Sequence, residues 1–80
     1  MDEDILAAMT PVDKRIVVTY AECGMTVNKT GRILYCSGNN VAYHLTKVRT
    51  TTGLDPRDFY QLGTLVALIN KERSEFDEHL

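Results

Sequence analysis

The sequence has few of the residues that disulfide frameworks and metal sites require. Its two cysteines, Cys23 and Cys36, are too few for a disulfide framework, and we expect them to be reduced, partly buried apolar residues. A zinc site that combined them with His44 and His79 would lack the closely spaced ligand pairs typical of zinc proteins. We therefore expect no metal and no other cofactor.

Long apolar runs and a glycine-rich phosphate loop are also missing. The longest apolar runs are only a few residues, too short for a membrane span, and the five glycines are widely scattered. No nucleophile pattern accompanies the two histidines, and the acidic residues 2–4 are opposite in charge to a secretory signal. We therefore expect a cytoplasmic protein that is not an enzyme, has no membrane contact and shows no evident small-molecule site.

The segment 26–53 contains no acidic residue. All eleven Asp and Glu residues lie outside it, so its bases give it a charge of +4, while the rest of the chain, with five bases and eleven acids, carries −6. A small basic surface of this kind suits a polyanion, although four bases could also belong to an ordinary solvated surface. The bases inside the segment are Lys29, Arg32, Lys47 and Arg49.

Eighty residues are enough for one domain, which spans residues 1–80. Residues 2–9 are expected to form a short amphipathic helix. The next four residues, Thr10-Pro11-Val12-Asp13, supply a capping hydroxyl, a proline at the first helical position and an acid at the third, as at the start of a helix. This second helix should run to about Cys23 and stop at Gly24. Its apolar face would consist of Val12, Ile16, Tyr20 and Cys23.

Local propensity leaves a second fold open. Residues 16–20 are β-branched or aromatic and would fit a strand. Residues 32–36 and 41–45 could pair as a hairpin around Gly38-Asn39. Three antiparallel strands covered by a carboxy-terminal helix would result, and propensity alone does not choose between this fold and an all-helical one.

The helical interpretation makes residues 26–53 a helix-turn-helix. In the first helix, Val27, Gly31 and Leu34 share a face, and the small residue in the middle allows a close crossing. Tyr35-Cys36 would form the turn, and Ser37 would cap a second helix that ends at Gly53. The core face of the second helix would hold Val41, Leu45, Val48 and Thr52, and its opposite face Asn39, Tyr43, Thr46 and Thr50.

A last helix is expected from about residue 56 to 73. Its start is indicated by Pro56 and Asp58, and the charged residues after Lys71 should fray. Leu65 and Leu68 widen its apolar surface beyond the face formed by Phe59, Leu62, Val66 and Ile69. That excess predicts a homodimer through this helix.

These residues resemble a known family. Gly31 and Leu34, residues 39–45, the Thr52-Gly53-Leu54-Asp55 sequence and the apolar residues 65–68 are similar to the carboxy-terminal helix-turn-helix domain of PucR and CdaR type bacterial transcription regulators. That domain is related to the Fis-like DNA-binding fold. The resemblance covers about residues 12–69 and implies an all-α bundle of four to five helices, in preference to the hairpin fold.

The sequence departs from the family pattern at Gly38, Asn40, Ala42 and His44. Family members usually carry threonine at the position of Asn40 and often a basic residue at the other three. Because phosphate contacts supply much of the affinity for DNA, these losses should weaken binding.

The resemblance implies a sequence-specific DNA-binding protein, a bacterial transcriptional regulator that reads the major groove of double-stranded DNA with helix 37–52. We expect Tyr43 to pack partly beneath the motif rather than to stack on a base. The alternative is a protein-interaction module that keeps the scaffold, uses its last helix and has lost affinity for DNA. The expected DNA contacts are Lys29, Arg32, Ser37, Asn39, Asn40, Tyr43, His44, Lys47 and Arg49.

Overall fold

The computed structural model describes residues 2–78, with side chains described to residue 75. Within this range the chain is all-α, as the resemblance implied, and the segments that could have formed a hairpin are helical. Residues 79–80, which include His79 of the zinc site considered above, lie outside the described range. The helices are α1 (Asp2–Ala7), α2 (Pro11–Glu22), α3 (Val27–Leu34), α4 (Gly38–Thr52) and α5 (Phe59–Glu78).

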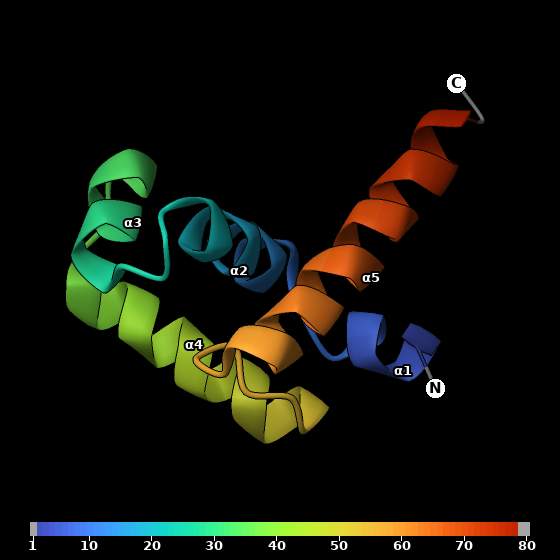
Figure 1. Ribbon diagram of the computed structural model, residues 1–80, viewed down its shortest axis with the longest axis horizontal. Helices are drawn as coiled ribbons and strands as arrows, with labels where there is room; N and C mark the ends of the chain where they lie inside the picture. The colour runs from blue at the N-terminus through green and yellow to red at the C-terminus, as the bar shows by residue number, and fades with distance from the viewer. Residues whose placement is uncertain (1, 79–80) are drawn as a thin grey trace.

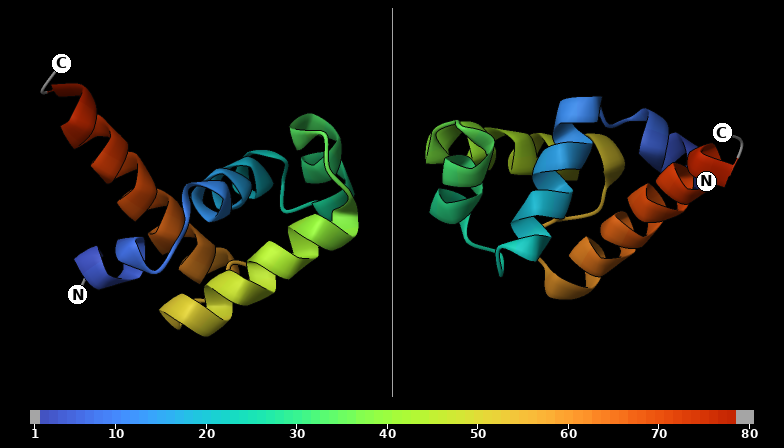
Figure 2. Two further views of the ribbon diagram at one scale, coloured as in Figure 1. Left: turned by 180° about the vertical axis from the view of Figure 1, so that it is seen from behind. Right: turned by 90° about the horizontal axis from the view of Figure 1, so that it is seen from above.

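Helix α2 is the centre of the bundle and contacts α3, α4 and α5 (Figure 1). Helix α3 packs on the first half of α4, whereas α1 and the carboxy-terminal half of α5 lie at the opposite end of the molecule (Figures 1 and 2). An ion pair of 2.9 Å between Lys14 Nζ and Glu72 Oε1 joins α2 to α5. None of the helices within residues 2–78 combines the length and the apolar character needed to cross a lipid bilayer.

The start and the end of α2 agree with the predicted signals. Thr10 Oγ1 accepts the backbone N–H of Asp13 at 3.1 Å, and the Asp13 carboxylate accepts that of Thr10 at 2.9 Å, so both halves of a capping box are present. The helix ends at Glu22 and is followed by Gly24 in a left-handed conformation with φ of 66°. Short-range chemistry therefore sets both ends of α2.

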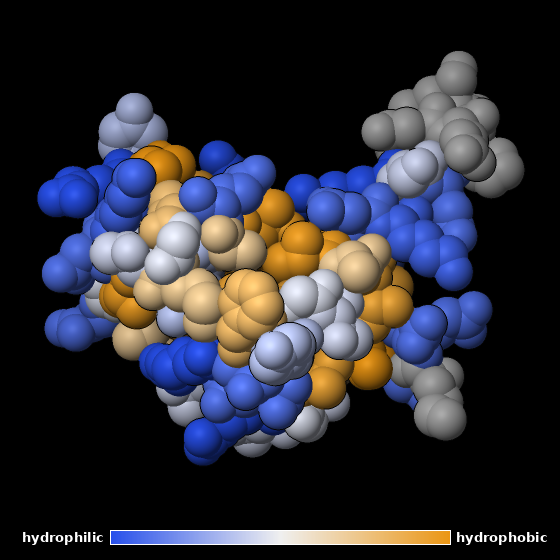
Figure 3. All heavy atoms as spheres, in the orientation of Figure 1, coloured by the Kyte–Doolittle hydropathy of each residue, from blue (hydrophilic) through white to orange (hydrophobic). Residues whose placement is uncertain are grey.

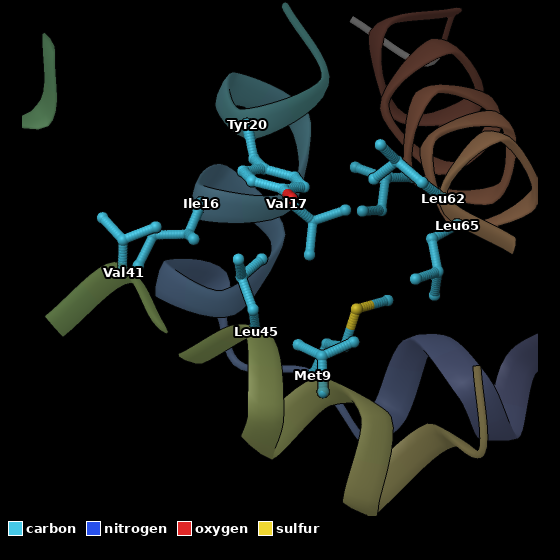
Figure 4. Packing of buried hydrophobic residues seen from close by; sticks show 10 residues of the cluster. Met9, Ile16, Val17, Tyr20, Val41, Leu45, Leu62 and Leu65 are labelled. Atoms are coloured by element: carbon cyan, nitrogen blue, oxygen red, sulfur yellow. The ribbon is translucent and has the colours of Figure 1, made fainter. Parts of the chain in front are cut away.

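The core lies between α2, α4 and α5 (Figure 4). Val41, Leu45 and Val48 line the buried side of α4 and are fully buried, as expected. Two expectations about apolar faces were wrong. Val12 is 53% exposed, and Leu65, which was expected to be available to a second subunit, is fully buried. The buried apolar side chains of the core cluster are Met9, Ile16, Val17, Tyr20, Val41, Leu45, Val48, Leu62, Leu65 and Ile69.

Helix α5 begins three residues later than predicted, at Phe59 rather than Pro56. The Asp55 carboxylate accepts the N–H of Arg57 at 2.9 Å, and the Asp55 carbonyl accepts the N–H of Asp58 at 3.0 Å, which closes a turn before the helix. Asp58 then caps α5 by accepting the N–H of Gln61 at 2.9 Å. Helix α5 also continues past the predicted end near residue 73, to Glu78.

One face of the fold carries an open apolar groove between α2 and α5, and Figure 3 shows apolar side chains gathered across this face. The groove has a volume of about 510 Å³. Phe59 and Tyr60 stand at its edge and are 68% and 80% exposed, although Phe59 was expected in the core. No pattern in the sequence predicts such a hollow. Its lining residues are Ala21, Gly24, Met25, Phe59, Tyr60, Leu62, Gly63 and Val66.

Gly31 allows the turn after α3 to approach that helix closely. A Cβ atom at this position would lie 2.6 Å from the carbonyl oxygen of Cys36 and 3.3 Å from the carbonyl carbon of Ser37. Both neighbours are backbone atoms, which cannot rotate away. The small residue was predicted to permit a close crossing of two helices, and the closest atoms belong to the turn that leads into α4.

We therefore expect Gly31→Ala to lower the free energy of unfolding by about 1–3 kcal/mol, because the turn must shift to admit the methyl group. Gly63→Ala is the matched control. A Cβ at Gly63 would meet nothing within 4 Å, so this change should raise stability by about 0.5–1 kcal/mol through helix propensity. Urea unfolding followed by circular dichroism measures both. A Gly31→Ala protein as stable as the Gly63→Ala protein would contradict the close approach.

Candidate nucleic-acid interface

Helix α4 presents a polar stripe to solvent along its whole length. Asn39, Tyr43, Thr46 and Thr50 are all exposed, and their spacing places them on one side of the helix, opposite the buried core side. Ser37 caps the helix by accepting the N–H of Asn40 at 3.0 Å. The helix ends at Gly53, which has φ of 80°. The predicted division of α4 into a buried face and an exposed face is therefore confirmed.

The turn before α4 fixes how that stripe is displayed. Tyr35 adopts a left-handed conformation with φ of 56°, and the N–H of Cys36 donates to the Gly31 carbonyl at 2.8 Å. These features close α3 and redirect the chain into α4 without a glycine at the αL position. Lys29 and Arg32 on α3 are both exposed, so α3 adds two cations to the interface.

Two of the predicted DNA contacts are engaged within the protein. His44 Nδ1 lies 2.6 Å from Asp13 Oδ1, and Lys47 Nζ lies 3.1 Å from Asp13 Oδ2. The side chains of His44 and Lys47 are 15% and 30% exposed, and that of Asp13 is fully buried. Asp13 of α2 therefore holds one flank of α4 against α2 through these two contacts. The sequence alone indicates only a capping role for Asp13.

The Asp13 carboxylate is held in its charged form. Burial raises the pKa of Asp13, but hydrogen bonds from His44, the Thr10 backbone, Lys47 and the Thr10 hydroxyl together lower the pKa below its ordinary value of 3.8. A carboxylate only accepts hydrogen bonds, so Nδ1 of His44 is the atom that carries the proton toward it. The imidazole is thereby oriented by Asp13.

Arg57 is a cation near α4 that lies outside the predicted set of DNA contacts. It lies in the turn before α5, donates from Nη1 to Thr46 Oγ1 at 3.2 Å and donates from Nη2 to the Ala42 carbonyl at 3.3 Å. Its position 15 residues after Ala42 gives no sequence signal of this contact, because helix periodicity does not extend through the intervening turn. In the sequence, only the basic charge of Arg57 just after residues 26–53 indicates that it could contribute to this surface.

The remaining predicted contacts are accessible. Tyr43 is 62% exposed, against the expectation that it would pack beneath the motif, and its ring meets that of His44 edge-on at 5.2 Å between centroids. Ser37 and Asn39 stand at the amino end of α4. The exposed members of the predicted set are Lys29, Arg32, Ser37, Asn39, Asn40, Tyr43 and Arg49.

A family model for the PucR C-terminal helix-turn-helix domain matches residues 14–69, which is more than half of the chain. The chain belongs to this family. Comparison with curated proteins gave no match, and comparison with solved structures gave none either. In the PucR-type domain described here, α3 and α4 form the helix-turn-helix, and α4 occupies the place of the recognition helix. The domain is of the type found in DNA-binding regulators.

In this PucR-type domain we expect Asp13→Asn to lower the free energy of unfolding by roughly 2–3 kcal/mol at neutral pH, because the charged hydrogen bonds to His44 and Lys47 are lost. The folded-state pKa of Asp13 is depressed, so its contribution is present above its ordinary value of 3.8 and is lost as the pH falls through the folded value. The difference between the two proteins should therefore shrink toward pH 3.

Urea unfolding at pH 7 and at pH 3 measures this difference. Asp58→Asn is a suitable control, since Asp58 is an exposed helix cap and asparagine caps a helix about as well as aspartate, so this change should cost less than about 1 kcal/mol. If Asp13→Asn were no more costly than Asp58→Asn, or equally costly at both pH values, the assigned role of the buried carboxylate would be wrong.

Proposed function

We propose that this protein binds double-stranded DNA in a sequence-specific manner, with α4 in the major groove, and acts as a transcriptional regulator in the bacterial cytoplasm. The observation that carries the proposal is the polar exposed face of α4, opposite its fully buried side, in a domain of the PucR helix-turn-helix family. A helix of this kind, preceded by a second helix and a tight turn, is how a helix-turn-helix protein presents side chains to base edges.

The side chains on this surface have complementary roles. The amides of Asn39 and Asn40 at the start of α4 suit base edges, because Asn can pair with adenine through two hydrogen bonds. Lys29, Arg32 and Arg49 are exposed cations that suit phosphates. The backbone N–H groups at the amino end of α4 and the Ser37 hydroxyl add further donors for a phosphate.

We assign His44 and Lys47 a positioning role. Both side chains bind Asp13. If they turned to a phosphate instead, the buried Asp13 carboxylate would lose its charged partners, which is energetically costly. This assignment removes two of the nine predicted contacts from the direct interface. Three exposed cations of the motif then remain for phosphate contacts. Because each contact contributes about −0.9 to the slope of log affinity against log salt, these three predict a slope of about −3 per chain.

Fluorescence anisotropy with duplex selected from a random pool tests the base contacts. We expect Asn39→Ala to reduce the affinity ratio between selected and random duplex by roughly ten-fold, because one bidentate base contact is lost. Asn70→Ala, at an exposed position on α5, is the matched control and should leave the ratio unchanged. No binding at tens of micromolar in low salt, where even nonspecific binding is expected, or binding indifferent to salt, would reject the proposal.

The groove between α2 and α5 favours a homodimer as the second part of the proposal. Leu65 is buried and cannot supply the contact, but Phe59 and Tyr60 project beside the open groove on the same face. A recess and a projection on one patch are what a two-fold symmetric interface needs, since each copy must offer both. A second copy of this chain is therefore the occupant that we propose.

Sedimentation velocity tests the dimer. We expect the unaltered protein to sediment as a dimer at micromolar concentration, and Tyr60→Glu to weaken association more than about 30-fold, as for a buried aromatic contact replaced by a charge. Tyr35→Glu alters an even more exposed tyrosine, 96% exposed, in the turn between α3 and α4 and should leave the dimer intact. Monomers at all concentrations for the unaltered protein would contradict this part alone.

The same groove also supports a second candidate function, a protein-interaction module. In that case a foreign apolar segment rather than a second copy would fill the groove, and DNA binding would be absent. The two candidates are separated by the variants above. If Tyr60→Glu abolishes the activity of the protein in the cell and Asn39→Ala does not, the interaction module is favoured. If Asn39→Ala abolishes that activity and Tyr60→Glu does not, DNA binding is favoured.

A further inference from the structure

Arg57 reaches the exposed side of α4 from outside the helix-turn-helix. It is an exposed residue of the turn between α4 and α5. Its guanidinium bonds to Thr46 Oγ1 and to the carbonyl oxygen of Ala42. Ala42 and Thr46 are one turn apart on α4, so the guanidinium lies alongside the middle of that helix, next to the polar stripe.

These two bonds leave most of the guanidinium free to bind another acceptor. A guanidinium has five N–H donors in a fixed plane, and α4 takes two of them, which leaves three. Both acceptors on α4 are uncharged oxygen atoms, so they do not neutralise the cation. The neighbouring carboxylates of Asp55 and Asp58 accept backbone N–H groups of residues 57 and 61. These carboxylates stay charged and weaken the positive potential around Arg57, but in the described part of the chain neither forms an ion pair with its guanidinium, so the forked donors remain available to a phosphate.

Arg57 also lies on the flank of α4 where Arg49 stands. Arg49 follows Ala42 by seven residues, or two helical turns, and so shares that side of the helix. The opposite flank carries Lys47, which is turned toward Asp13. The two arginines thus border the same edge of the polar stripe. A helix in the major groove has a sugar-phosphate backbone along each edge, so this edge faces phosphates.

We propose that Arg57 is a DNA-contacting residue that binds a phosphate beside the groove occupied by α4. The inference rests on the proposed DNA binding and extends the interface beyond residues 26–53 to the turn before α5. Its hydrogen bonds to α4 hold the guanidinium in place before DNA arrives, which reduces the entropy lost when the contact forms.

The test uses Arg57→Gln, which removes the charge and keeps a polar side chain, and whose amide ends two bonds short of the Nη atoms that bond to α4. Affinities for two unrelated duplexes are measured by fluorescence anisotropy over a series of salt concentrations. We expect roughly ten-fold weaker binding for both duplexes alike, because a phosphate contact carries no sequence information. With Arg57 as a fourth phosphate contact beside the three cations of the motif, the slope of log affinity against log salt should be about −3.6 for the unaltered protein and shallower by about 0.9 for Arg57→Gln.

Two variants separate this role from a structural one. Arg73→Gln removes the same charge from the carboxy-terminal half of α5, away from α4 (Figure 1), and should leave the slope unchanged. Arg57→Lys keeps the charge and should keep the slope. An Arg57→Gln slope equal to that of the unaltered protein, or an Arg57→Lys slope as shallow as that of Arg57→Gln, would overturn the inference alone. Failure of the unaltered protein to bind DNA would overturn the proposed function together with it.

Discussion

The buried carboxylate of Asp13 is the interaction on which the placement of α4 depends. Asp13 lies in the first turn of α2 and closes the capping box with Thr10. It also holds His44 and Lys47, which are three residues apart and therefore neighbours on one flank of α4. A fully buried charge is costly unless it is paired and hydrogen-bonded. These bonds therefore favour one arrangement of α4 against α2 over nearby alternatives.

Apolar packing alone would fix α4 less strictly. Val41, Leu45 and Val48 bury fully, but burial of apolar surface is non-directional and tolerates small rotations of a helix about its axis. The charged bonds to Asp13 are directional, because they weaken steeply when the donor moves out of line. The core stripe brings α4 into contact with α2, and the carboxylate sets which residues of α4 face solvent.

The contact of Asp13 with α4 also makes the charge pattern of the folded chain differ from the pattern along the sequence. Along the sequence, residues 26–53 are free of acids, and Asp13 lies well outside them. In the fold Asp13 neutralises part of this charge by binding Lys47, while Arg57 brings a cation to α4 from the other direction. The basic surface is therefore shifted across α4 toward the flank of Arg49. Counting charges along the sequence therefore predicts which helix carries a basic surface, but not which side of that helix carries it.

The parts of the fold that could be predicted are those set by neighbours in sequence. The caps at Thr10, Ser37 and Gly53 and the two faces of α4 depend on residues within one or two turns of each other. The contacts of Asp13 with α4 span more than 30 residues and have no periodic signal. The predicted start of α5 at Pro56 was wrong because of a local side-chain hydrogen bond. Pro56 is compatible with a first helical position, but the Asp55 side chain bonds the N–H of Arg57 and forms a turn there instead.

The apolar surface of α5 shows why helical periodicity alone could not locate a subunit contact. Its apolar residues cover a wide arc, so the sequence admits several rotations of the helix. Met9 lies on the side of Leu65 (Figure 4), and Leu65 is fully buried. Phe59 and Tyr60, by contrast, are exposed beside the groove. Among the residues whose side chains are described, Phe59 and Tyr60 are the exposed large apolar side chains that α5 offers to a second subunit. These two residues directly follow the turn that carries Arg57, so the surface proposed for a second copy and the surface proposed for DNA meet within residues 57–60.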